Sequence, residues 1–243
     1  LRDYQETAID NLRKALTDKE KPVLSSPTGS GKTRIASEIF ALARAKNRRV
    51  VFVVPFISLI NQTWKAFSNA GIDDREMGVI QAQHELTDWR MPVQIASAQT
   101  LERRPKLPDA DIVIFDECHI QRKIYQRWMK ENPKAYFIGL SATPWAVGMD
   151  AIWSKMIVVS TLADLIQKGH LAPFRYFAPA QPDLSEVRSA RGDYVESDLE
   201  RAMNRPDLIA DIINTWRERG EDRPTFCLDR KSTRLNSSHT DIS

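Results

Sequence analysis

The stretch Ser25-Ser-Pro-Thr-Gly-Ser-Gly-Lys-Thr33 decides how the rest of this chain is interpreted. A short apolar segment, Pro22-Val-Leu24, comes directly before it, and apolar residues recur at helical spacing over residues 34–44 after it. A strand followed by a glycine-rich turn and a helix is the context that a phosphate-binding loop requires. The stretch therefore predicts such a loop between a buried strand and a helix.

The glycines and the two residues after them supply the chemistry of this loop. Gly29 and Gly31 can adopt backbone angles that other residues avoid, so successive N–H groups can point into one concavity that suits an anion. The start of the helix adds partial positive charge. Lys32 would reach the β- and γ-phosphates of a nucleotide, and the Thr33 hydroxyl would bind Mg²⁺. The strict pattern has glycine where Ser26 stands, so the alternative is a glycine-rich turn that binds nothing.

Composition is that of an ordinary globular protein. The chain has 243 residues, enough for one large or two small domains, with 42% hydrophobic and 28% charged residues. No apolar run approaches the length of a membrane span and no signal peptide is visible, so we expect no membrane partner. Cys118 and Cys227 form no disulfide framework, which predicts a reduced, cytoplasmic setting. The net charge of +3 is too small to indicate nucleic acid, and basic pairs such as Arg122-Lys123 are interpreted as solvated helix ends.

Strands and helices alternate along the chain as far as Trp145, which predicts an α/β fold with a parallel sheet. Ligands of such sheets bind at the carboxyl ends of the strands. The expected strands are residues 22–24, 48–54, 93–96, 110–115 and 135–140. The expected helices are residues 1–16, 34–44, 58–70 (capped by Ser58), 98–104 and 122–130.

After Trp145 the pattern loosens, and we place a domain boundary near residues 160–175. The elements expected there are a strand at 156–159, a helix at 162–168, a strand at 174–177, a polar loop at 185–194, helices at 196–203 and 207–219, and the start of a buried strand at 225–228.

An apolar strand that ends in Asp116 and Glu117 is the second motif that indicates a function. Next to a phosphate-binding loop, Asp116 would hold Mg²⁺ through water, and Glu117 would orient or deprotonate the attacking water. Acids at strand ends are common, so a structural role is the alternative. The order of the loop, then Asp-Glu-x-His, then Ser-Ala-Thr is much more specific than any one of these motifs.

Taken together, these motifs resemble superfamily 2 helicases and translocases of the DExD/H group. More narrowly, the chain is similar to the branch of type III restriction ATPase subunits and phage-encoded DNA helicases, in which Ser26 is a tolerated variant. The resemblance covers about residues 1–228. It rests on Leu1-Arg-Asp-Tyr-Gln5, Pro27–Thr33 (motif I), Val54-Pro-Phe-Ile-Ser-Leu-Ile-Asn-Gln62 (motif Ia), Ala96-Ser-Ala-Gln-Thr-Leu101 (motif Ib), Asp116-Glu-Cys-His119 (motif II) and Ser141-Ala-Thr143 (motif III).

The resemblance implies an ATP-dependent helicase or translocase with ATP and Mg²⁺ as cofactors and a nucleic acid as partner, DNA in preference to RNA. It implies catalytic roles for Lys32, Asp116 and Glu117, with Mg²⁺ bound by Thr33 and Asp116. ATP would be bound by Gln5, which reads the adenine, and by Thr28, Gly29, Ser30, Gly31, Lys32 and Thr33. Coupling of the ATP state to nucleic acid would fall to His119, Ser141 and Thr143. Nucleic-acid backbone contacts would come from Pro55, Gln62, Ser97, Gln99 and Thr100, with a helix cap as the alternative for Ser97.

The resemblance also divides the chain. It implies a RecA-like ATP-binding domain over residues 1–165, and a linker with the start of a second RecA-like domain over residues 166–228. Motif IV should begin at Thr225-Phe-Cys-Leu228, and motif VI with its arginine fingers would come later. Residues 229–239 instead resemble one reading frame of a sequencing-adapter oligonucleotide, so residues 229–243 are expected to be an artefactual tail. We therefore expect an incomplete motor with little or no hydrolytic activity.

Other classes of function stay open at this point. A P-loop kinase or a simple nucleotide-binding module would share the loop, although the Asp-Glu-x-His and Ser-Ala-Thr motifs argue against a kinase. The motor subunit of a restriction nuclease would share every motif, and a nuclease domain downstream would distinguish it. DNA and RNA are not distinguished by the residues themselves, because backbone contacts carry little sequence information.

Overall fold

The computed structural model describes residues 1–81, 84–177, 183–190, 193–204, 206–221 and 223–225. The chain forms two compact units, Leu1–Pro173 (unit 1) and Phe174–Ser243 (unit 2). Within the described residues, each helix is too short or too polar to span a bilayer. The candidate site residues all lie in unit 1.

Unit 1 is built on a seven-stranded sheet with the order β3-β4-β2-β5-β6-β1-β7. Every pairing in it is parallel. The strands are β1 (Pro22–Ser25), β2 (Val50–Val54), β3 (Met77–Ile80), β4 (Val93–Ser97), β5 (Ile112–Phe115), β6 (Tyr136–Ser141) and β7 (Lys155–Val158). The inner strands are continuous apolar runs because helices cover both of their faces. The predicted α/β fold with a parallel sheet is confirmed.

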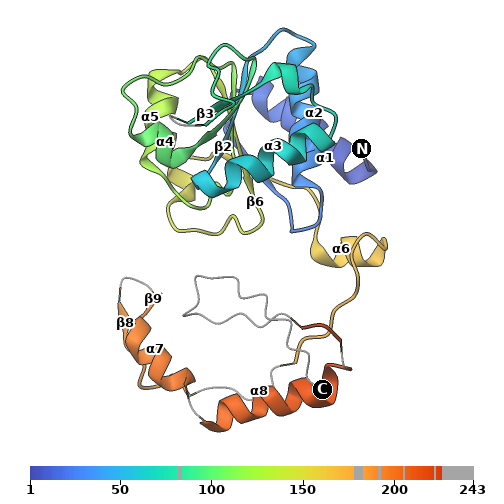
Figure 1. Cartoon of the computed structure of the whole chain (residues 1–243), viewed down its shortest axis with the longest axis vertical. Coiled ribbons are helices and arrows are strands. Elements are labelled where there is room, and N and C mark those ends of the chain that lie inside the picture. The colour runs from blue at the N-terminus through green and yellow to red at the C-terminus, as the bar shows by residue number, and fades with distance from the viewer. Residues whose placement is uncertain (82–83, 178–182, 191–192, 205, 222, 226–243) are drawn as a thin grey trace. The chain divides into compact units, whose positions relative to one another are not determined.

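Helices form a layer on each face of the sheet (Figure 1). One hydrophobic core contains side chains of α1 (Asp3–Thr17), α2 (Lys32–Arg44), α3 (Ile60–Asn69) and α6 (Leu162–Gln167). A second core contains side chains of α4 (Ala98–Glu102) and α5 (Lys123–Glu131). Successive residues of β2 alternate between the two cores, as the period of a strand requires. Short 3₁₀ helices complete the unit: η1 (Ile57–Leu59), η2 (Asp74–Glu76) and η3 (Met149–Ala151).

The parallel register brings the motif-bearing strand ends to one edge of the sheet. Ser25 at the end of β1 pairs with Ser141 at the end of β6. Val54 at the end of β2 pairs with Ser97 at the end of β4, and β5 ends at Phe115 between these pairs. The loops that leave this edge carry the phosphate-binding loop and motifs Ia, Ib, II and III.

Two local predictions for unit 1 need correction. The sequence did not predict β3, which is short and contains Gly78, a position where the Asp88 carbonyl and Gln94 leave no space for a side chain. The prediction that Ser58 caps a helix is wrong, because Ser58 lies inside η1 and α3 begins after it without a side-chain cap. Local residue preference did not anticipate the short 3₁₀ turn between β2 and α3.

Unit 2 contains α7 (Glu196–Met203), α8 (Pro206–Arg219) and a short antiparallel pair, β8 (Ser189–Ala190) with β9 (Asp193–Tyr194). The two predicted helices are confirmed, whereas the stretch predicted as a polar loop carries the β8–β9 pair. The predicted strand at 174–177 is wrong, since these residues pair with no strand in the described part of the chain. Residues 226–243, with the predicted tail, lie outside the described residues.

Unit 1 continues through α6 to Pro173. The reason is packing: Leu165 is fully buried, and Leu171 packs against the same core. The assignment of residues 166–228 to a linker and a second RecA-like domain stays a prediction.

Candidate functional site

The phosphate-binding loop adopts the backbone that its glycines predict. Gly29 (φ 81°) and Gly31 (φ 89°) both lie in the left-handed region. The helix α2 begins at Lys32, with Gly31 as its N-cap. The first N–H groups of α2, which have no partner within a helix, therefore start at this loop, as in an anion-binding site.

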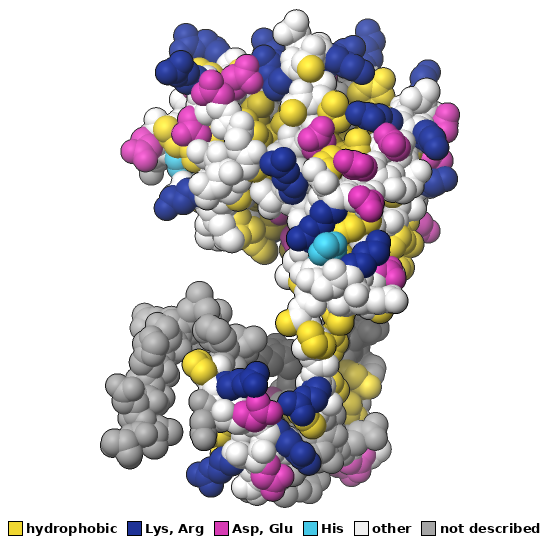
Figure 2. Space-filling model, turned by 90° about the vertical axis from the view of Figure 1, so that its right-hand side faces the viewer, with side chains coloured by type: hydrophobic (Ala, Val, Ile, Leu, Met, Phe, Trp, Pro, Cys, Tyr) yellow, Lys and Arg dark blue, Asp and Glu magenta, His cyan; other side chains and the backbone are white. Residues whose placement is uncertain are grey.

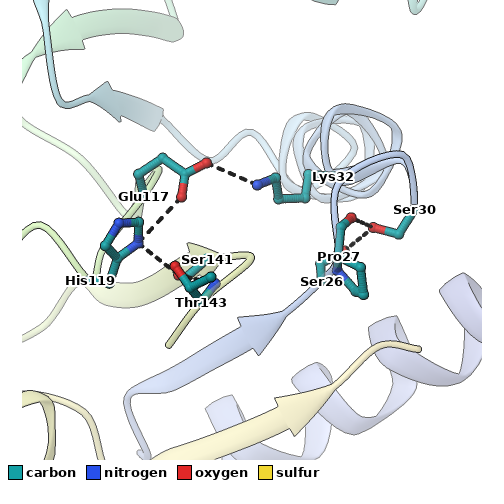
Figure 3. A network of polar contacts seen from close by, with 8 residues as sticks. All are labelled: Ser26, Pro27, Ser30, Lys32, Glu117, His119, Ser141 and Thr143. Carbon is teal, nitrogen blue, oxygen red and sulfur yellow. Dashed lines mark hydrogen bonds and ion pairs between the residues drawn. The ribbon is translucent and has the colours of Figure 1, made fainter. Parts of the chain in front are cut away.

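Two serine hydroxyls close the loop from inside (Figure 3). The Ser30 hydroxyl donates to the Pro27 carbonyl oxygen at 2.5 Å, and the Ser26 and Ser30 hydroxyl oxygens are also 2.5 Å apart. Because Ser30 uses its proton on Pro27, Ser26 is the donor to Ser30. Both serines are buried. Ser26 thus makes a contact within the loop that the glycine of the strict pattern could not make.

The helix α1 holds the loop through Tyr4 and Gln5. The Tyr4 hydroxyl and Gln5 Nε2 both donate to the Ser30 carbonyl, at 2.9 and 3.0 Å. Gln5 Oε1 accepts from the Arg2 backbone N–H at 2.9 Å. A Cβ at Gly31 would lie 2.5 Å from Gln5 Nε2, so this close approach also requires glycine. The Gln5 amide is therefore engaged by protein here, and its reading of adenine stays a prediction.

The end of β5 delivers two carboxylates beside the loop. The Asp116 N–H donates to the Val53 carbonyl at 2.9 Å, which continues the sheet past the end of β5. Glu117 then turns the chain with a φ of 46°, in the left-handed region. Its carboxylate Oε1 lies 2.9 Å from Lys32 Nζ (Figure 3). With side chains 20% and 30% exposed, Lys32 and Glu117 form a partly buried ion pair.

Asp116 is partly buried, and its surroundings disfavour the charged form of its carboxyl group. Burial raises the pKa of the Asp116 carboxyl, the negative charge of Glu117 raises it further, and the charge of Lys32 opposes both. Asp116, Lys32 and Thr33 line one cavity of about 150 Å³. A carboxylate and a hydroxyl around such a cavity suit Mg²⁺, which takes oxygen ligands and retains waters. A bound cation would also offset the buried charge of Asp116.

His119 connects this carboxylate pair to the end of β6. Its Nδ1 shares a hydrogen bond of 2.9 Å with the Ser141 hydroxyl and lies 3.4 Å from Glu117 Oε2. The Ser141 hydroxyl also accepts from the Thr143 N–H at 3.0 Å. Lys32, Glu117, His119, Ser141 and Thr143 are therefore linked by consecutive contacts (Figure 3). The structure brings together all three residues predicted to couple the ATP state to nucleic acid.

The residues of motif Ib that were predicted to contact nucleic acid differ in how deeply they are buried. Ser97 is fully buried. Its hydroxyl accepts from the Thr100 N–H at 3.0 Å and donates to Thr100 Oγ1 at 2.8 Å, so it is the N-cap of α4. Gln99 and Thr100 are partly exposed. Gln99 Oε1 accepts from the Ile57 N–H at 3.4 Å, which joins motif Ib to motif Ia.

In motif Ia, Pro55 is buried and Gln62 is exposed. Gln62 also lines the cavity shared by Lys32 and Asp116, so the structure places it beside the residues predicted for ATP. Leu171, which no motif indicated, lies against the phosphate-binding loop: a Cβ at Gly29 would be 2.6 Å from Leu171 Cδ2. Neither position carries a local sequence signal, since each depends on how distant segments pack.

Charge is not concentrated into one block on the face that Figure 2 shows. Over unit 1, Lys and Arg side chains alternate there with Asp and Glu side chains. This mixture agrees with a net charge of only +3. Any attraction of a polyanion must therefore come from local groups and not from a strong overall field.

Residues 1–146 match the protein family described as "Type III restriction enzyme, res subunit". The chain belongs to this family. A similar protein is the "51.5 kDa protein" of Lactococcus phage (isolate 7-9), 27% identical over 205 residues, which are 80% of this chain and 40% of that protein. Another is "DNA 3'-5' translocase XPB2" of Sulfurisphaera tokodaii, 32% identical over 147 residues, 59% of this chain and 31% of that protein. The chain thus spans less than half the length of these two similar proteins.

Solved structures show the same fold. The "UvsW helicase from Bacteriophage T4" superposes with a TM-score of 0.56 at 18% identity, over 65% of this chain and 59% of that chain. The Type ISP restriction-modification enzyme LlaGI gives a TM-score of 0.55 at 20% identity, over 70% of this chain and 20% of that chain. The described sheet of unit 1 is accordingly that of a RecA-like domain.

Proposed function

We propose that this chain is the ATP-binding part of a motor that uses ATP hydrolysis to move along DNA or to separate its strands. The proposal is supported by a series of contacts that runs from Lys32 through Glu117 and His119 to Ser141 (Figure 3). It links the phosphate-binding loop to motif III, as a motor that couples ATP to nucleic acid requires. Membership of the res-subunit family supports the same reading.

ATP with Mg²⁺ supplies the phosphoryl group that is transferred to water. Lys32 would bind the β- and γ-phosphates, with Gln5 and the loop residues Thr28–Gly31 around the rest of the nucleotide. Thr33 and Asp116 would hold Mg²⁺. Glu117 would release Lys32 and contact the attacking water instead. There it would orient or deprotonate that water. ATP binding would therefore open the 2.9 Å ion pair between Lys32 and Glu117.

Coupling would pass through His119. Its Nδ1 lies within reach of both the Glu117 carboxylate and the Ser141 hydroxyl, so a movement of Glu117 changes what His119 contacts. Ser141 would transmit that change to the backbone at Thr143. This is a contiguous physical network between two sites, which is the kind of path that energetic coupling can use.

The nucleic-acid contacts would come from motifs Ia and Ib at the same edge of the sheet. Gln99 and Thr100 are partly exposed there, whereas Ser97 and Pro55 would support the surface from below. We favour DNA because XPB2 is described as a DNA translocase and the family takes its description from a restriction enzyme. A plant relative described as an RNA helicase makes RNA the alternative.

ATP binding is tested with a fluorescent ATP analogue and Mg²⁺. We expect Lys32→Ala to remove most of the binding, because Lys32 provides the side-chain cation at the loop. Lys14→Ala, an exposed lysine of α1, is the matched control and should bind as the wild type does. Equal affinity of the Lys32 variant and the wild type would rule out the proposed site.

Nucleic-acid binding is tested by titrating labelled DNA and RNA strands at about 50 and 200 mM salt. We expect binding that is weak, independent of sequence and steeply dependent on salt, because backbone phosphates dominate such contacts. A strong sequence preference, or affinity that does not change with salt, would argue against a motor surface.

A second candidate function is the motor subunit of a restriction nuclease. The family description favours it, and so does a 31% match over 134 residues to the "Type I restriction enzyme EcoKI endonuclease subunit" of Escherichia coli. The two candidates share the chemistry of unit 1. A nuclease activity that depends on ATP in the longer protein would select the second, and ATP-driven movement without cleavage would select the first.

A further inference from the structure

A surface outside the ATP site combines an exposed aromatic ring with an arginine. Phe56, in the loop after β2, is 41% exposed. The guanidinium carbon of Arg122, at the start of α5, lies 5.5 Å from the centre of the Phe56 ring, within the range of a cation–π contact. An aromatic ring held by a cation and still open to solvent is a platform on which another flat ring can stack.

Arg122 has hydrogen-bonding capacity that its neighbours leave unused. Its nearest acidic partner is Glu102, at 3.9 Å, too far for a hydrogen bond. Its Nε is buried and has no hydrogen-bond partner among the described residues. The Arg122 side chain is still 23% exposed, so an acceptor brought by a ligand would bind its exposed part and not the buried Nε.

The cavity beside Arg122 suits an anion. Its volume is about 460 Å³, and it is lined by Glu102, Gln121, Arg122, Lys123, Ile124 and Arg127. Arg127 is already engaged by the Glu131 carboxylate and by the carbonyls of Arg104 and Pro105. Arg122 and the exposed Lys123 remain as the cations of this cavity that could bind an anion. The helix α5 also begins there with no side-chain cap and no acid in its first turn. The uncompensated end of α5 adds to their positive charge.

This surface is continuous with motifs Ia and Ib. Phe56 is flanked by Pro55 and by Ile57, whose N–H donates to Gln99. On the other side, Gln121 donates to the Val147 carbonyl in the loop after β6. The ring, the arginine and the cavity therefore lie next to the residues proposed to contact the nucleic-acid backbone.

We propose that Phe56 and Arg122 form a subsite for single-stranded nucleic acid, in which an unpaired base stacks on Phe56 and a neighbouring phosphate binds Arg122. The subsite rests on the proposed function, since it extends the same nucleic-acid path. A stacking ring next to a cation is the arrangement that single strands use, because every base has a flat face and every nucleotide a phosphate. A duplex offers the phosphate and keeps its bases stacked inside, so Phe56 favours the single strand.

The test measures fluorescence anisotropy of a labelled oligo-dT strand, an abasic strand of the same length and a blunt duplex. For the wild type we expect oligo-dT to bind more tightly than the abasic strand. Phe56→Ala should weaken oligo-dT binding about 5- to 150-fold, the range for one stacked base, and leave abasic binding nearly unchanged. Phe56→Leu should behave like Phe56→Ala, since leucine keeps apolar bulk without a ring.

Arg122→Gln should weaken binding of both strands and lower the dependence of affinity on salt by about one phosphate contact. Arg13→Gln removes an exposed arginine of α1 that pairs with Asp10. This control should change neither the affinity for the strands nor its dependence on salt. The variants should bind the fluorescent ATP analogue as the wild type does, which verifies folding.

The outcomes separate this proposal from the one on which it rests. If the wild type binds oligo-dT and the abasic strand equally, or if Phe56→Leu binds like the wild type, the stacking subsite is overturned and the motor surface stands. If Arg122→Gln binds both strands like the wild type, the phosphate contact is overturned. If the wild type binds none of the three probes, the proposed nucleic-acid function itself fails.

Discussion

At the scale of single residues, Asp116 and Glu117 are adjacent in the sequence and have different environments. Asp116 is partly buried and has a raised pKa, whereas Glu117 forms an ion pair with Lys32. A raised carboxyl pKa means that the folded structure disfavours the charged form of Asp116. The residue proposed to hold Mg²⁺ thus lowers the stability of the fold when it is charged.

Asp116→Asn should therefore raise the melting temperature of the chain at neutral pH in the presence of a chelator and without nucleotide. The pKa of Asp116 is raised above the model-compound value of 3.8, so the folded state binds this proton more tightly than the unfolded state. Stability is then lost as pH rises above that value, and the advantage of the Asn substitution should shrink as pH falls toward it. Thermal melts of both proteins across this pH range are the measurement. A lower melting temperature for the variant at neutral pH would contradict the argument.

Glu117→Gln should tighten binding of the ATP analogue to the chain. The substitution removes the carboxylate that holds Lys32 Nζ at 2.9 Å and that would repel the phosphates. Partly exposed ion pairs contribute about 0.2–1 kcal/mol, which predicts roughly 1.5- to 5-fold tighter binding. Asp10→Asn, in the exposed pair with Arg13, is the control and should leave the affinity unchanged. Weaker binding by the Glu117→Gln variant would show that Glu117 helps to hold the nucleotide.

At the scale of elements, the short helix α4 shows how one residue can belong to a functional motif and still act through structure. Ser97 is fully buried, and its hydroxyl satisfies the Thr100 N–H at the start of α4. Gln99, two positions later, is partly exposed and contacts the Ile57 backbone. The two residues should therefore respond differently to substitution.

Ser97→Ala should lower the free energy of unfolding by about 1 kcal/mol, the usual cost of losing a helix N-cap. Gln99→Ala should leave that free energy nearly unchanged and weaken binding of labelled DNA. Urea denaturation and DNA titration of both variants give the comparison. A Ser97 variant with wild-type stability and impaired DNA binding would instead identify Ser97 as a direct contact.

At the scale of the whole molecule, the proposed motor needs more than the residues of unit 1. In the proposed function, Lys32, Thr33, Asp116 and Glu117 would position phosphates, Mg²⁺ and water. They do not neutralise the charge that develops on the transferred phosphoryl group. In related phosphoryl-transfer enzymes an arginine finger contributes about 10³–10⁵ in rate. The resemblance assigns that arginine to motif VI, which none of the quoted motifs of this sequence matches.

A polypeptide of these 243 residues should therefore show little or no ATP hydrolysis, with or without nucleic acid. A longer protein with both RecA-like domains should turn over ATP at least about 10³ times faster, and Glu117→Gln should abolish that activity. Phosphate release in the presence of single- and double-stranded DNA is the measurement. Turnover by the 243 residues alone at about 1–100 s⁻¹, the range of kinases, would show that no further arginine is required.

Local sequence patterns were sufficient to predict the loop at Ser25–Thr33, the acids that follow β5, and the parallel α/β class. These features are local: glycine is needed where φ is positive, and apolar periodicity separates a doubly covered strand from a helix. The same reasoning missed β3 and misplaced a cap at Ser58, where short segments carry weak local preferences.

Tertiary packing determines which side chains meet. It paired Lys32 with Glu117, engaged Gln5 with the Ser30 carbonyl, and set Arg122 over Phe56, although the sequence indicated a solvated helix end at Arg122. These contacts join segments that the strand order β3-β4-β2-β5-β6-β1-β7 brings to one edge of the sheet. Periodicity along the chain does not encode that order, because it reports which face of an element is buried and not which element covers it.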